Sequence, residues 1–66
     1  MVDAKGFHPM RGDCYVGNKV IFKSGEIITL DMDGMQWAPR DKDGKILAWL
    51  SGAYDLCSWI VARDQI

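Results

Sequence analysis

Short runs of β-branched and aromatic residues alternate with turns that contain Gly or Asp from residue 13 onward. Two such runs, residues 19–23 and 26–30, are separated only by Ser24 and Gly25. Two strand-like runs joined in this way indicate a β-hairpin, because Gly readily adopts the positive φ that a tight turn requires. The pattern therefore predicts a hairpin over residues 19–30.

The Asp-x-Asp-Gly sequences at residues 31–34 and 41–44 predict two further turns, with strands at 35–38 and 45–50 between and after them. Both sequences resemble the start of a calcium-binding loop, which needs Glu at its twelfth position. The twelfth residues are Lys42 and Gly52, so both loops lack that ligand. Plain β-turns explain them better, because Asp tolerates turn geometry and Gly permits positive φ.

The C-terminal segment supports two interpretations. A stripe of apolar residues at spacings of three and four is typical of a helix; it comprises Ile46, Leu50, Ala53, Cys57 and Ile60. The Ser51-Gly52 break and the β-favouring residues 59–61 argue against one long helix. We expect a helical turn over 53–57 and a final strand over 58–63, with a single helix over 46–63 as the alternative.

The expected fold is α+β and mostly β. It is a small antiparallel meander of four to five strands with a short helical turn before the last strand. Residues 1–12 are expected to form an irregular N-terminal arm, since Gly6, Pro9 and Gly12 discourage regular structure. Residues 13–66 form the single small β-rich domain.

Composition favours a protein that associates with itself or with a partner. Of the 66 residues, 48% are hydrophobic and three are Trp, which is more apolar side chain than so short a chain is expected to hide. The formal net charge is −1, and the Lys and Arg residues are scattered among acids. A nucleic-acid-binding surface usually forms a basic patch, so nucleic acid is disfavoured as a partner.

No stretch predicts membrane insertion or secretion. The most apolar segment, residues 46–62, is interrupted by Ser51, Gly52, Asp55 and Ser58, and is too short to span a bilayer. We therefore expect a cytoplasmic protein.

Candidate catalytic and metal-binding residues are few. A thiol nucleophile, Cys14 or Cys57, would need the single histidine, His8, as its base, and His8 lies in the expected irregular arm. A zinc site would lack two further ligands. We expect free thiols, no cofactor and no enzymatic activity.

Four aromatic side chains are the best candidates for binding residues: Trp37, Trp49, Tyr54 and Trp59. Trp and Tyr combine a large apolar face with a polar tip, so they favour interfaces and ligand pockets. The alternative for each is a place in the core. A domain of this size has little interior, so we expect that not all four are internal.

The C-terminal half resembles a family of small phage proteins. The resemblance rests on Asp43-Gly44-Lys45-Ile46, Trp49-Leu50-Ser51, Asp55-Leu56 and Trp59-Ile60-Val61, within residues 43–61. The spacing from Asp55 to Trp59 is two residues shorter than in the family. Members include phage inhibitors of the bacterial Thoeris defence system, which are homo-oligomers that sequester a cyclic ADP-ribose-type nucleotide in pockets between subunits.

The resemblance implies a phage-type anti-defence protein that sequesters a signalling nucleotide. If the protein is phage-encoded, its expected location is the host cytoplasm. The four aromatic residues would stack on the base, and Arg40 or Lys45 would contact phosphate. One alternative is an inhibitor module that docks on a host protein through an exposed aromatic surface. Another is a structural subunit that acts through homo-oligomerisation.

Overall fold

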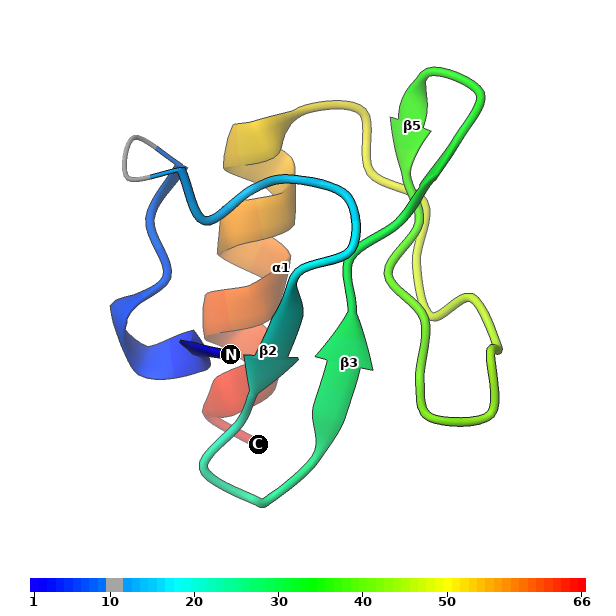
Figure 1. The fold of residues 1–66 in the computed structure, drawn as a ribbon. Helices are drawn as coiled ribbons and strands as arrows, with labels where there is room; N and C mark the ends of the chain where they lie inside the picture. The colour runs from blue at the N-terminus through cyan, green and yellow to red at the C-terminus, as the bar shows by residue number, and fades with distance from the viewer. Residues whose placement is uncertain (10–11) are drawn as a thin grey trace.

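The computed structural model describes residues 1–9 and 12–66 and contains two small sheets followed by one helix (Figure 1). The first sheet has the order β1-β2-β3, formed by Val2–Asp3, Lys19–Ile21 and Ile27–Thr29. The second pairs β4, Met32–Asp33, with β5, Gln36–Trp37. A 3-10 turn, η1, covers Ala4–Gly6, and helix α1 covers Ala53–Asp64.

The predicted hairpin is confirmed. Strands β2 and β3 pair antiparallel, with Lys19 opposite Thr29 and Ile21 opposite Ile27. Gly25 adopts a φ of 95° in the connecting turn, and its amide donates to the Phe22 carbonyl at 2.9 Å. The positive φ at the predicted position shows why this turn could be recognised from the sequence.

The two sheets share one antiparallel register. Thr29 bridges to Arg40, and each donates its amide to the other's carbonyl at 2.9 Å. The next pair is Met32 with Trp37. Met32 lies three residues after Thr29, and Trp37 lies three residues before Arg40, so the antiparallel register is unchanged. The predicted strand over 35–38 thus includes β5, and its continuation to Arg40 connects β3 with the second sheet.

A β-bulge interrupts the pairing of the last extended segment, residues 45–50. Two isolated bridges hold this segment to its neighbour: Arg40 with Ile46, and Trp37 with Leu50. Between the bridges lie two residues on one segment, 38–39, and three on the other, 47–49. One residue more on one side than on the other defines a bulge, which bends the backbone and redirects side chains. Trp49 is one of the three.

The predicted end of the chain is wrong. A twelve-residue helix occupies Ala53–Asp64, where we expected a helical turn followed by a strand over 58–63. The fold is therefore α+β with the helix after the strands. The expected mostly β meander, with a short helical turn before a last strand, is wrong. The alternative helix over 46–63 also began too early, because Gly52 has extended dihedral angles, φ −146° and ψ 169°, and lies at the helix N-terminus.

Packing explains why the helix forms despite β-favouring residues. Leu56 and Ile60 lie one turn apart on α1, and both are fully buried. Burying two large aliphatic side chains stabilises the fold by several kcal/mol, roughly 1.5–3 each, which exceeds the few tenths that β-branched residues cost a helix. Asp55 in the first turn and Arg63 in the last also complement the helix dipole.

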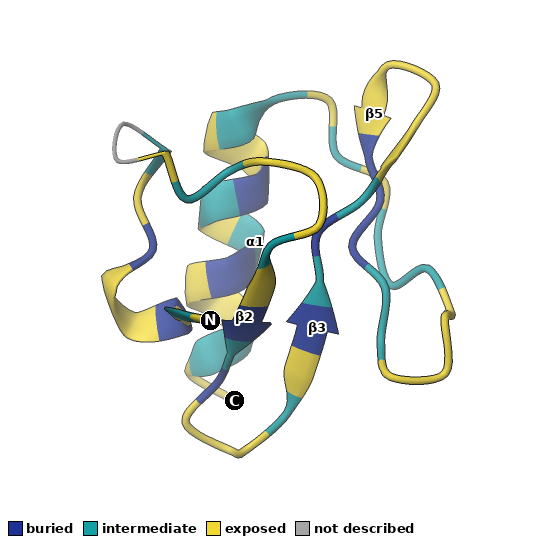
Figure 2. Ribbon diagram, viewed as in Figure 1, coloured by how far each residue is buried: buried dark blue, intermediate teal, exposed yellow. Residues whose placement is uncertain are grey.

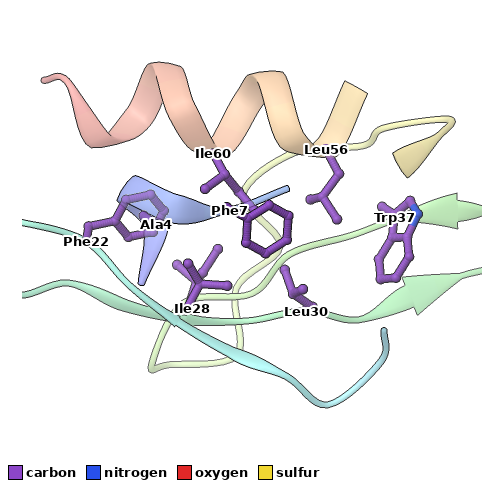
Figure 3. Packing of buried hydrophobic residues seen from close by; sticks show 9 residues of the cluster. Ala4, Phe7, Phe22, Ile28, Leu30, Trp37, Leu56 and Ile60 are labelled. Atoms are coloured by element: carbon purple, nitrogen blue, oxygen red, sulfur yellow. The ribbon is translucent and has the colours of Figure 1, made fainter. Parts of the chain in front are cut away.

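The core lies between α1 and the strands (Figure 3). Buried positions alternate with exposed ones along β2 and β3, so one face of the sheet is directed toward the helix (Figure 2). The buried hydrophobic cluster comprises Ala4, Phe7, Val20, Phe22, Ile28, Leu30, Trp37, Leu56 and Ile60.

The N-terminal segment takes part in this architecture. Strand β1 pairs parallel with β2, with Val2 opposite Val20. The η1 turn packs against α1, and Ala4 and Phe7 are buried in the core. Residues 2–7 of the segment expected to be an irregular arm therefore supply an edge strand and two core side chains.

Candidate functional site

The six residues predicted to bind a ligand do not line one pocket. Trp37 is only 9% exposed and belongs to the core cluster, where Figure 3 shows it at one end, beside the strands. Its backbone pairs with Met32 on one side and with Leu50 on the other. This indole therefore stabilises the junction of the extended segments.

Trp59 lies on α1 and is half-buried against the core. The guanidinium carbon of Arg63 lies 5.2 Å from the centre of its ring, within the range of a cation–π contact. Arg63 also makes two hydrogen bonds to Glu26, from Nε to Oε1 at 2.8 Å and from Nη2 to Oε2 at 2.9 Å. Trp59 thus forms part of the contact between the helix and the β2–β3 turn.

Trp49 and Tyr54 are the exposed members of the aromatic set. Trp49, on the bulge, is 52% exposed, and Tyr54, in the first turn of α1, is 68% exposed. The expectation that not all four aromatic residues are internal is therefore confirmed. Trp49 is an exposed indole on backbone that the bridges at Ile46 and Leu50 hold in place.

The two predicted phosphate contacts have different environments. Arg40 donates from Nε to Asp31 Oδ2 at 2.9 Å and from Nη1 to the Gly44 carbonyl at 2.8 Å. The bond from Arg40 lowers the pKa of Asp31 below its usual range. Arg40 therefore has an internal role, fastening the 41–44 turn to the start of β4. Lys45 is exposed, and its amide donates to Asp41 Oδ1 at 3.0 Å.

The turn predicted at 41–44 is confirmed in detail. Asp41 Oδ1 accepts hydrogen bonds from the amides of Asp43 and Lys45, and Gly44 has a φ of 82°. An Asp side chain that accepts from the amide two residues later is typical of an Asx turn. The carboxylate thus shapes the turn.

A cavity of about 460 Å³ lies between the β2–β3 turn and this second turn. Three of its six lining residues are acidic; the lining comprises Gly25, Glu26, Ile27, Asp41, Lys42 and Asp43. The hydrogen bonds from Arg63 lower the pKa of Glu26, so Glu26 carries a charge at neutral pH. A second cavity of about 220 Å³ is lined by Ser24, Glu26, Arg63 and Ile66. None of the six predicted binding residues lines either cavity.

The thiols are poorly suited to nucleophilic catalysis. Burial, together with the neighbouring Cys57 and Asp13, raises the pKa of Cys14 to about 11. Burial also raises the pKa of Cys57. The thiolate is the reactive form, and both groups are protonated at neutral pH. Within residues 1–9 and 12–66, no three His, Cys, Asp or Glu side chains are grouped so that they could hold a metal ion.

Two exposed methionines were not identified from the sequence. Met35, in the β4–β5 turn, is 88% exposed, and Met32 on β4 is also exposed. The signal for Met35 was its position directly after Gly34 in a predicted turn, where an apolar side chain has little to pack against.

Comparison with known proteins gives no relative: no protein-family model, no curated protein and no solved structure matches the chain. Among the described residues, no helix is long and apolar enough to cross a membrane, since α1 has twelve residues.

Proposed function

We propose that this protein is a non-catalytic binding module that docks on a protein partner through a surface centred on Trp49. The observation that carries the proposal is the 52% exposure of the Trp49 indole on a β-bulge. Trp is enriched among the few residues that dominate binding energy at protein interfaces.

Hydrogen bonds within the chain fix the backbone on both sides of Trp49. Trp37 and Leu50 exchange hydrogen bonds of 2.7 and 2.9 Å, and the Leu47 amide donates to the Pro39 carbonyl at 2.8 Å. Leu47 and Leu50 also pack against the core. A side chain presented on fixed backbone loses less conformational entropy on binding, which favours affinity. Bulges are over-represented at such functional positions because they redirect a side chain.

A protein partner fits the charges better than a nucleotide bound within one chain. The cavity of about 460 Å³ contains Glu26, Asp41 and Asp43, and carboxylates repel phosphate groups. Arg40, the expected phosphate ligand, already binds Asp31 and the Gly44 carbonyl. An exposed indole outside the cavities instead suits a protein surface with an apolar pocket.

Sequestration of a signalling nucleotide between two copies of the chain is the second candidate. It is favoured by the resemblance of residues 43–61 to phage anti-defence inhibitors and by the exposure of Trp49 and Tyr54, which both lie in that stretch. In such a site the exposed rings of two copies would enclose the base, so the pocket would exist only in the oligomer.

The decisive experiment compares three immobilised proteins in a cell extract: wild type, Trp49→Ala and Tyr15→Ala. Tyr15 is 58% exposed on a different segment and serves as the matched control. We expect one protein to be retained at fixed stoichiometry by the wild type and by Tyr15→Ala, and to be lost with Trp49→Ala. Identical retention by all three proteins would contradict the proposal.

The same samples test the second candidate. After washing, each protein is heated, and the released small molecules are analysed by mass spectrometry. A nucleotide released from the wild type but not from Trp49→Ala, with an oligomer seen by light scattering, would replace docking by sequestration as the function.

A further inference from the structure

We propose that Cys14 and Cys57 are a redox-sensitive pair that closes to an intrachain disulfide in the presence of a disulfide oxidant such as oxidised glutathione. The bond would join the segment before β2 to helix α1. The proposal is independent of the function proposed above, since neither cysteine takes part in that surface.

Two hydrogen bonds connect the chain segments that carry the cysteines. Cys57 Sγ donates to the Phe7 carbonyl at 3.3 Å. The amide of His8, the next residue, donates to Asp13 Oδ2 at 3.1 Å. Residue 13 precedes Cys14, so the contacts lead from one thiol to the other through neighbouring residues.

Packing and electrostatics agree with this placement. Cys14 and Cys57 are both half-buried and both pack against the same hydrophobic cluster. Each thiol lies within electrostatic range of Asp13, and the negative charge of Cys57 would raise the pKa of Cys14. Both cysteines are free thiols in this structure.

The reaction is an exchange of two thiols for one disulfide. The Cys57 thiolate attacks one sulfur of glutathione disulfide, forms a mixed disulfide and releases one glutathione thiol. Cys14 loses its proton to water and attacks the Cys57 sulfur, which releases the second glutathione. The protein loses two electrons and two protons, and glutathione disulfide takes up the electrons. Because both thiols hold their protons at neutral pH, the reaction is expected to accelerate as pH rises.

The test incubates the native protein with glutathione disulfide at mildly alkaline pH and measures its intact mass. We expect the wild type to lose the mass of two hydrogen atoms, and proteolysis under non-reducing conditions to give one peptide pair linked through Cys14 and Cys57. A disulfide stabilises by restricting the unfolded chain, so the oxidised protein should melt roughly 5 °C or more above the reduced protein.

The variants Cys14→Ser and Cys57→Ser provide the matched controls. Ser at position 57 can still donate to the Phe7 carbonyl, so the fold should be kept. Each variant has one thiol and should accumulate one attached glutathione, which the wild type resolves. Wild-type protein that keeps glutathione on either thiol, or that links two chains instead of closing within one, would overturn the proposal. The wild-type peptide map decides the question even if a variant fails to fold.

Discussion

Single side chains at the end of α1 fasten the helix to a turn far away in the sequence. Arg63 binds Glu26 across 37 positions, and Asp64 Oδ1 accepts a hydrogen bond from the Lys23 amide at 2.9 Å. Both partners lie in or beside the β2–β3 turn. The sequence showed these charges but not their pairing, because pairing across such a separation depends on how the helix packs.

The Glu26–Arg63 pair gives the fold a pH dependence. Arg63 lowers the pKa of Glu26 in the folded protein, so the pair stabilises the fold above the unfolded pKa of this carboxyl. The stabilisation is lost as pH falls through the lower, folded pKa. Since the Glu26 side chain is 34% exposed, solvent screening limits the contribution to about 1 kcal/mol at most.

We therefore expect Glu26→Gln to lower the free energy of unfolding by about 0.5–1 kcal/mol at neutral pH. The difference from wild type should shrink in acid, as measured by urea denaturation over a pH series. Asp33→Asn is the control, because Asp33 is an exposed acid on β4 outside both ion pairs of the described chain. An equal loss for Glu26→Gln at every pH would refute the electrostatic explanation.

At the scale of elements, local signals were sufficient for the turns and insufficient for the helix. The Ser24-Gly25 turn and the turn at 41–44 were identified because Gly25 and Gly44 adopt positive φ there. The C-terminal helix was divided wrongly, since Trp59, Ile60 and Val61 favour strands by intrinsic preference. Tertiary burial of Leu56 and Ile60 outweighs that preference, and a local reading of the sequence cannot measure it.

The β2–β3 turn offers a direct test of its glycine. Gly25 has a φ of 95°, and an added Cβ would meet nothing within 4 Å, so any cost comes from backbone conformation alone. We expect Gly25→Ala to destabilise the fold by about 1–2 kcal/mol. Gly6→Ala is the matched control, since Gly6 also has open space around it but no positive φ.

Thermal or urea unfolding of both glycine variants measures the difference. The Gly6 substitution should change stability by less than about 0.5 kcal/mol, in the range of ordinary surface changes. If Gly25→Ala were equally harmless, the turn would have to adopt another conformation, and the hairpin register, with Lys19 opposite Thr29, would need to be reconsidered.

At the scale of the whole molecule, the sequence predicted that the small core cannot bury every large aromatic side chain. It did not predict which of these side chains are exposed. Trp37 and Trp49 both follow short turns and both lie in extended segments. Trp37 is buried and Trp49 is exposed. The bulge adds one residue to the 46–50 segment between the Arg40–Ile46 bridge and the Trp37–Leu50 bridge, so Leu50, and not Trp49, lies opposite Trp37. A shift of register by one residue moves a side chain to the other face. No local pattern in the sequence of residues 45–50 predicts this change of register.

The different exposures of the three indoles predict a fluorescence experiment on the intact protein. Trp49 is the exposed indole, Trp59 is half-buried and Trp37 is buried. We expect Trp49→Phe to remove most of the emission that acrylamide, a neutral quencher, can reach, while leaving the melting temperature nearly unchanged. Trp37→Phe should keep the quenchable emission and lower the melting temperature, because it leaves a void in the core.

The concentration dependence of this quenching distinguishes a foreign partner from a second copy. If Trp49 docks on a different protein, the quenchable fraction of the purified wild type should stay constant as its concentration rises, and fall when the partner captured from the extract is added. A fall with concentration alone would show that copies of the chain cover Trp49 for one another. Tyr15→Ala should behave as wild type in both titrations, because its exposed ring lies on another segment.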